Sequence, residues 1–197
     1  TAALGGADTG DDNTAVGLNA GFHITTGARN TAVGQSALED NTTASDNVAI
    51  GQEAMMKNQT GGSNVAIGRY ALRTLGTDTG SGTVFGQLNV AIGQSASYNQ
   101  NNDSMNVAVG ANALQNCTTG NLSVAMGRLA AHSATTGSQN VSIGYAASQN
   151  ATTAQNCVTL GYNSAPSSNT ASHEVTLGNS STNNLRCNDT SISSLSD

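Results

Sequence analysis

Apolar and polar residues alternate in a five-residue stretch that recurs along the whole chain. Asn64-Val-Ala-Ile-Gly68 is one copy, and most other copies differ from it by conservative replacements. Two weaker copies close the series, Cys157-Val-Thr-Leu-Gly161 and Glu174-Val-Thr-Leu-Gly178. Alternation with a period of two predicts a short β-strand, in which the second and fourth residues share one face and the third lies on the other. The glycine that follows predicts a bend or a positive φ.

The stretch occurs ten times at a nearly constant spacing. Successive motif glycines are 17 residues apart, except that Gly93 follows Gly68 by 25 residues, which is 17 plus an insertion of eight. A fixed spacing of this kind predicts a repeat architecture. The asparagines and glycines assigned to the structural repeat are Asn13, Gly17, Asn30, Gly34, Asn47, Gly51, Asn64, Gly68, Asn89, Gly93, Asn106, Gly110, Gly127, Asn140, Gly144, Gly161 and Gly178.

Each repeat is numbered here from its asparagine, or the residue in its place, as position one. Position eight is Ala in the first eight copies, position nine is often Leu or Met, and positions 13 to 15 carry turn residues such as Thr-Thr-Gly. These features predict two short strands and two turns per repeat. Such units stack at about 4.8 Å, so we expect an all-β parallel β-solenoid of about ten 17-residue coils, roughly 45–50 Å long. The asparagines should stack into a hydrogen-bonded ladder.

One coil alone buries little. If positions two, four and nine point inward, they supply about 1.5–3 kcal/mol each, whereas ordering 17 residues costs on the order of 25 kcal/mol. Small residues at positions three and eight then suggest a second dry surface, where another backbone comes close. We therefore expect two further copies of the chain as partners, in a threefold bundle that keeps all chains parallel.

The repeat pattern divides the chain into segments. Residues 1–12 form an incomplete entry coil, 13–181 the coils, and 182–197 an extended segment that winds with its partners. The insertion lies at about 73–88 and must leave the coil. Since loops on rigid scaffolds often carry recognition, it is the expected recognition loop, for which we single out Arg73, Asp78, Val84 and Phe85.

Composition narrows the function. Charged residues are 9% and aromatic residues 3% of the chain, and the net charge of -6 with six Lys and Arg disfavours nucleic acid as a partner. No apolar run reaches the length of a membrane span, so no direct membrane insertion is expected. Arginines and tyrosines form either a weak strip for sugars or acids or merely solvated turns: Arg69, Arg73, Arg128, Tyr70 and Tyr145.

Enzymatic motifs are scarce. No GxSxG, P-loop or HExxH sequence occurs. A glycosidase needs two carboxylates about 5–9.5 Å apart, and the plausible acids are Glu39, Asp40, Glu53 and Glu174. We expect scattered surface acids, no catalytic residues, no metal and no cofactor, with a polysaccharide-degrading enzyme as one alternative.

The copies Asn47-Val-Ala-Ile-Gly-Gln-Glu-Ala54 and Asn64-Val-Ala-Ile-Gly-Arg-Tyr-Ala71 resemble the head repeats of trimeric autotransporter adhesins of the YadA type. The resemblance covers residues 13 to about 181 and implies a left-handed parallel β-roll, trimerised side by side, with the two apolar residues of the motif turned inward. The period of 17 is longer than the family's usual 14 to 16, so larger outer turns are expected.

The C-terminal end is similar to a different family. Val175-Thr-Leu-Gly178 and the stretch from Leu185 to Asp197 look like the segment before the endosialidase-type intramolecular chaperone of phage tail fibres. In that family the chaperone assembles the trimer and cuts itself off near a Ser-Asp junction, to which Ser196 and Asp197 correspond.

Together the two resemblances imply the distal receptor-binding or shaft segment of a phage tail fibre, located on the virion. Its receptor on the host surface would be a polysaccharide or an outer-membrane protein. A bacterial trimeric adhesin head is the first alternative, and a polysaccharide-degrading tailspike is the second.

Overall fold

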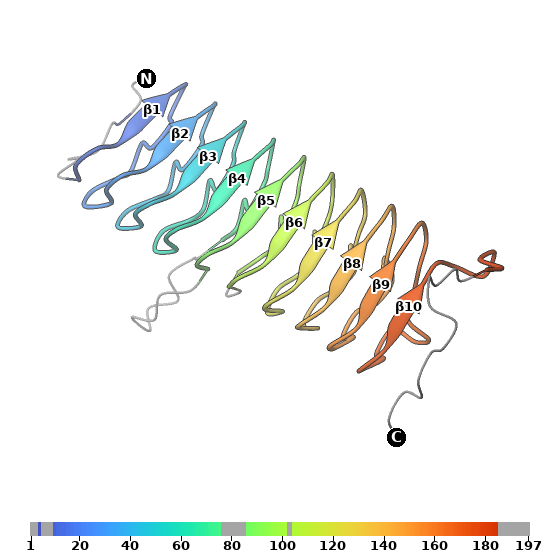
Figure 1. The fold of residues 1–197 in the computed structure, drawn as a ribbon. Helices are drawn as coiled ribbons and strands as arrows, with labels where there is room; N and C mark the ends of the chain where they lie inside the picture. The colour runs from blue at the N-terminus through green and yellow to red at the C-terminus, as the bar shows by residue number, and fades with distance from the viewer. Residues whose placement is uncertain (1–3, 5–9, 76–85, 102–103, 185–197) are drawn as a thin grey trace.

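The computed structural model describes residues 4, 10–75, 86–101 and 104–184. The chain winds as a parallel β-solenoid whose ten strands form one sheet in sequence order (Figure 1). Coil n is named after its strand βn. The strands are β1 (Thr14–Val16), β2 (Thr31–Val33), β3 (Val48–Ile50), β4 (Val65–Ile67), β5 (Val90–Ile92), β6 (Val107–Val109), β7 (Val124–Met126), β8 (Val141–Ile143), β9 (Val158–Leu160) and β10 (Val175–Leu177).

The register repeats the sequence period. Val48 pairs with Val65 at the usual spacing of 17, and Val65 pairs with Val90 across the insertion. Strands β4 and β5 are therefore direct neighbours, which confirms that the repeat after the insertion resumes in register.

The prediction of two strands per coil is wrong. Each coil has one strand of three residues, and outside these strands the only bridge in the described ranges joins Gln155 to Ser172. The reason is the backbone at positions seven, nine and 17, which is left-handed in most coils. In coil 3 these residues are Glu53, Met55 and Ser63, with φ of 54°, 47° and 60°. Left-handed residues turn the chain and cannot continue an extended strand.

The predicted orientation of the strand is also wrong. Ala49 and Ala66, at position three, are fully buried, whereas Ile50 and Ile67, at position four, remain 38% and 37% exposed. The small residues therefore fill the solenoid interior, and the large ones point away from it. The interior is too thin for a large side chain on the strand, because position nine already fills it, with Leu38, Met55 and Leu72 in coils 2 to 4.

Position eight is likewise interior. Ala54 and Ala71 have no exposed surface, so the small residues do not mark a contact with another copy. The core thus combines one methyl group from the strand, one from position eight and a longer side chain from position nine.

The motif glycine is required for two reasons. Gly51 has φ of +132°, and a Cβ there would lie 2.7 Å from the backbone carbonyl carbon of Gly68 in the next coil. A side chain would therefore meet both backbone strain and a steric clash. The predicted bend is confirmed at this position.

The predicted asparagine ladder is confirmed through its first six coils. Asn47 Oδ1 accepts hydrogen bonds from the backbone N–H of Asn64 at 3.0 Å and from Asn64 Nδ2 at 3.1 Å. Asn64 Nδ2 also donates to the carbonyl of Gly86 at 2.7 Å. Buried amides need such partners, since an unsatisfied one costs about 1–3 kcal/mol. The ladder thereby ties each coil to the one before it.

Candidate functional site

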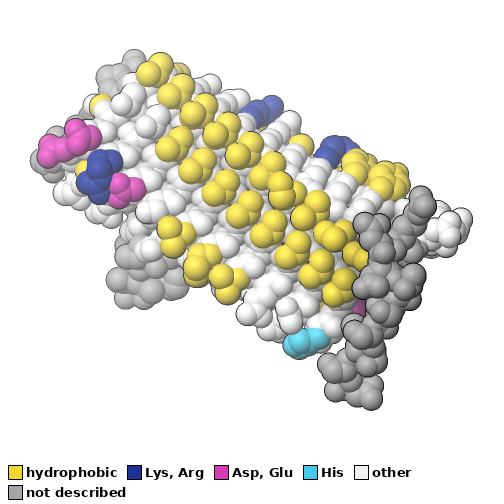
Figure 2. All heavy atoms as spheres, viewed as in Figure 1, with side chains coloured by type: hydrophobic (Ala, Val, Ile, Leu, Met, Phe, Trp, Pro, Cys, Tyr) yellow, Lys and Arg dark blue, Asp and Glu magenta, His cyan; other side chains and the backbone are white. Residues whose placement is uncertain are grey.

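The outward side chains of the strands form an apolar band. Positions two and four supply Val, Ile, Met, Leu and Thr in every coil, and Figure 2 shows the band as two yellow rows along the whole solenoid. Many of its members are about two-fifths exposed or more: Val16, Ile92, Met126, Ile143, Val175 and Leu177. A contiguous apolar surface of this length is unusual on a monomer and typically marks an interaction site. This surface is called the strand face below.

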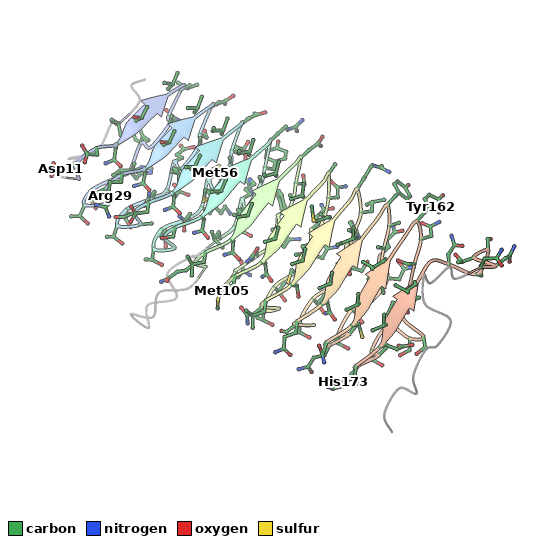
Figure 3. The ribbon with its side chains drawn as sticks, in the orientation of Figure 1. Asp11, Arg29, Met56, Met105, Tyr162 and His173 are labelled. Carbon is green, nitrogen blue, oxygen red and sulfur yellow. The ribbon has the colours of Figure 1, made fainter. Side chains whose placement is uncertain are left out.

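Two columns border the strand face. Figure 3 shows Arg29, Met105 and His173 at the edge where the strands begin, and Tyr162 at the edge where they end. The first edge is the position-17 column. It carries the Arg29–Asp46 ion pair, with Nε and Oδ1 2.6 Å apart, and three exposed apolar side chains with φ of 59° to 61°, Leu88, Met105 and Leu122.

The Arg29–Asp46 pair lies on the surface. The hydrogen bond from Arg29 lowers the pKa of Asp46, and the same bond raises the pKa of Arg29. Both groups therefore stay charged over the ordinary pH range, although solvent makes such a pair weakly stabilising.

The second edge of the strand face is the one where the strands end. Next to the insertion it continues into a cluster of side chains around Arg73. Arg73 Nε donates to Glu53 Oε2 at 2.7 Å and Nη1 donates to the Tyr98 hydroxyl at 3.2 Å. Its guanidinium lies 5.9 Å and 5.7 Å from the ring centres of Tyr70 and Tyr98. Those two rings meet edge to face, with centres 6.0 Å apart. The cluster thereby links coils 3, 4 and 5 across the insertion.

The charge of Arg73 is held by its surroundings. Partial burial lowers the pKa of Arg73, but the hydrogen bond to the Glu53 carboxylate and the neighbouring Tyr98 hydroxyl raise it by more, so the net change is upward. Arg73 and Glu53 are thus an ion pair within the cluster, and Arg73 is not a free cation.

Two further arginines, both at position six, contact a tyrosine each. Arg69 lies 4.3 Å from the ring centre of Tyr70 and donates to its hydroxyl at 2.9 Å. Arg128 lies 5.7 Å from the ring centre of Tyr145 and donates to that hydroxyl at 3.1 Å. Tyr145 in turn stacks on Tyr162, with ring centres 5.4 Å apart and an interplanar angle of 14°. The strip of arginine and tyrosine therefore forms two separate clusters.

Sequence reasoning missed two members of these clusters. Tyr98 shares repeat position ten with Arg73, and Tyr162 shares position six with Tyr145. Aligning the repeats by position was the signal that could have found both. Of the expected recognition loop, Arg73 lies in coil 4, while Asp78, Val84 and Phe85 fall outside the described residues, as do Ser196 and Asp197.

The candidate acids lie in three coils: Glu39 and Asp40 are neighbours in coil 2, Glu53 is in coil 3 and Glu174 is in coil 10. Glu39 accepts a hydrogen bond from Asn19, Glu53 pairs with Arg73, and Glu174 accepts bonds from Ser167. Asp40 lies 3.4 Å from His23 Nδ1. Each carboxylate thus has a local partner, and within the described ranges no group of three or more His, Cys, Asp or Glu is arranged to hold a metal ion.

A depression of about 550 Å³ lies beside the last coils, lined partly by Tyr162, Asn163, Thr176 and Asn179. Its amide and hydroxyl groups offer both donors and acceptors of hydrogen bonds. It adjoins the Tyr145–Tyr162 stack, so the second cluster ends in a polar hollow.

Comparison with known proteins adds no relative: no protein-family model, curated protein or solved structure matches the chain. Its class follows from the fold, which is an all-β parallel β-solenoid with one strand per coil. In the part of the chain that the structure describes, no helix is long and apolar enough to cross a membrane.

Proposed function

We propose that the chain is a homotrimeric attachment segment of a phage tail fibre, built as a left-handed solenoid. The observation that carries the proposal is the strand face, which leaves large apolar side chains exposed in eight of the ten coils and half-buried ones in coils 2 and 6. Burying a wholly exposed side chain of this kind is worth about 1.5–3 kcal/mol. Since most of these side chains are about two-fifths exposed, covering each one adds roughly 1 kcal/mol, and the gain is summed along the whole face.

The period of the face favours a second copy of the same chain as the cover. Its apolar side chains recur once per coil, at a step of about 4.8 Å. A partner with the same step, running parallel, meets this pattern in every coil, whereas an unrelated surface meets it only locally. Three parallel copies around one axis close the assembly and leave no strand face exposed.

The assignment to a tail fibre rests on two sequence resemblances, one of the repeats and one of the C-terminal end. The repeats are similar to adhesin heads, and the end is similar to the segment before a phage chaperone. In a trimer, three copies of each binding element act together and raise the apparent affinity for a surface receptor. The head repeats by themselves equally favour a bacterial adhesin.

The assembly is tested by the mass of the protein in solution. Ile67→Asp places a carboxylate in the middle of the strand face and should convert the trimer to monomers, because a buried unpaired charge is strongly unfavourable. Thr43→Asp, which adds the same charge at an exposed turn, is the matched control and should leave the mass unchanged. A wild-type chain that sediments as a folded monomer contradicts the proposal.

Attachment is tested separately. The purified trimer should compete with the phage that encodes it for adsorption to its host. Failure to compete, with the trimer intact, would show that this segment is shaft and that recognition lies elsewhere in the fibre.

A further inference from the structure

The position-six column runs along the edge of the strand face where the strands end. Its members are exposed in nearly every coil, and none is acidic, although the chain contains 12 acids and only six basic residues. Figure 2 shows dark-blue side chains along this edge of the apolar band. The column consists of Leu18, Gln35, Gln52, Arg69, Gln94, Ala111, Arg128, Tyr145, Tyr162 and Asn179.

The two arginines of the column carry unneutralised charge. Arg29 and Arg73 pair with carboxylates, but in the described part of the chain neither Arg69 nor Arg128 makes a salt bridge. Each is instead held by a tyrosine, through one hydrogen bond to the hydroxyl and a contact with the ring. A guanidinium has five N–H donors, so one bond to a phenol leaves donors and the full positive charge for a ligand.

The remaining side chains of the column suit a sugar. Gln35, Gln52 and Gln94 offer amide donors and acceptors at exposed sites. Tyr145 and Tyr162 are 41% and 62% exposed, and tyrosine combines an apolar ring with a hydroxyl, as recognition of a partly apolar, partly hydroxylated ring requires. A planar carboxylate is the group that an arginine fork binds best.

The spacing of the charges indicates an extended ligand. Arg69 and Arg128 belong to coils 4 and 7, so three strand steps of about 4.8 Å separate them by about 14 Å. One small acid cannot bridge that distance, whereas a polymer lying along the solenoid axis can. We propose that the position-six column binds an acidic polysaccharide that runs parallel to the fibre, an inference that rests on the attachment function proposed above.

A neighbouring copy is the competing occupant of the two arginines. In a parallel trimer the opposite edge of the strand face carries the carboxylates of Asp12 and Asp46. Asp46 is already bound by Arg29 of its own chain through two hydrogen bonds, and Asp12 lies before β1, several coils from coils 4 and 7 of a copy in register. The structure therefore favours an external acid over a contact between copies.

The test measures binding of the trimeric protein to immobilised polygalacturonate, alginate and hyaluronate, with neutral dextran as the reference polymer. Binding should be detectable for at least one acidic polymer, absent for dextran, and weaker at high ionic strength, because exposed charges are screened. Arg69→Gln and Arg128→Gln should each weaken binding about threefold, and the double variant about tenfold. Lys57→Gln removes the same charge from an exposed site at position 11 and should change nothing.

Several results would overturn the proposal. One is an equal loss of binding in the Lys57 variant and the arginine variants. Another is binding to dextran as strong as binding to the acidic polymers, and a third is no binding to any acidic polymer. Sedimentation of every variant separates these results from a failure of assembly. If Arg69→Gln or Arg128→Gln dissociates the trimer, the column is a contact between copies and the polysaccharide site is refuted, while the trimer stands.

Discussion

Coils 2 to 4 and coils 7 to 9 of the solenoid have the same backbone path but differ in the side chains that fill their interiors. Coils 2 to 4 place Leu38, Met55 and Leu72 at position nine, whereas coils 7 and 8 place Ala131 and Ser148 there. In coils 8 and 9 the strand alanine becomes serine or threonine, and Ser148 Oγ lies 2.6 Å from Thr159 Oγ1. Apolar filling thus gives way to hydrogen bonding.

The asparagine ladder at position one also differs between these two regions. Coils 7 and 9 have Ser123 and Cys157 at position one, yet the backbone N–H of each still donates to the preceding asparagine, at 2.8 Å and 2.9 Å. A small void of about 10 Å³ opens among coils 7 and 8, lined by residues that include Ala131, Ser142 and Ser148. The coil geometry is therefore set by backbone ladders and glycines, while the core side chains set how stable each region is.

The largest difference should follow from truncating the core. Leu72→Ala removes a fully buried side chain and should lower the free energy of unfolding by about 2–5 kcal/mol per chain. Ser148→Ala, at the same position in coil 8, should cost about 1 kcal/mol, the value of one hydrogen bond. Urea unfolding measures both, and equal losses would mean that the two regions do not differ.

Glycine substitutions compare the regions at the backbone. Gly68→Ala would place Cβ 2.6 Å from the Gly93 carbonyl oxygen, whereas at Gly161 the nearest atom is the Cα of Gly178 at 3.2 Å. Both sites also have left-handed φ. We expect losses of about 3 kcal/mol for Gly68→Ala and about 1–2 kcal/mol for Gly161→Ala from strain and clash. The Gly68→Ala protein should therefore have the lower melting temperature of the two variants, and the reverse order would refute the geometry.

The ladder can be both broken and repaired. Asn64→Ala removes the acceptor for the Asn89 backbone N–H and should cost about 1–3 kcal/mol. Ser123→Asn restores the ladder residue in coil 7 and should stabilise the protein by about 0.5–1.5 kcal/mol. Hydrogen exchange at the N–H of Asn89 and of Asn140 reports the two effects locally. Faster exchange in the Ser123 variant would show that coil 7 cannot accommodate the amide.

The smallest effect concerns Ser142, which borders the void. Its buried hydroxyl has no hydrogen-bond partner within the described structure. Ser142→Ala should therefore leave stability unchanged or raise it by up to about 1 kcal/mol. A clear loss in thermal unfolding would show that the hydroxyl is satisfied in solution, for example by a buried water.

The sequence predicted the period, the parallel stacking, the glycine bend and the ladder because each depends on a residue type at a fixed spacing. It did not predict which face of the strand is interior. Alternation shows that Ala66 and Ile67 point to opposite sides, but only the width of the coil decides which side is inside. The larger residue was wrongly assigned to the interior.

The second strand was predicted wrongly because left-handed conformations at positions seven and nine fall on residues such as Glu53 and Met55. Those residue types give no signal of a positive φ. At the candidate site, Arg69, Arg73 and Tyr70 were named from sequence, but Tyr98 follows Arg73 by 25 residues, and the insertion obscured their shared position.

The most direct test of the account is the solvent accessibility of the strand face in the assembled protein. Ile92→Cys and Thr43→Cys place a thiol on that face and on an exposed turn, and mass spectrometry of the labelled peptides separates them from the native cysteines. If copies of the chain cover the face, the thiol at position 92 should react far more slowly with a soluble maleimide than the thiol at position 43. Equal rates in the folded protein would contradict the central claim that the strand face is an interface.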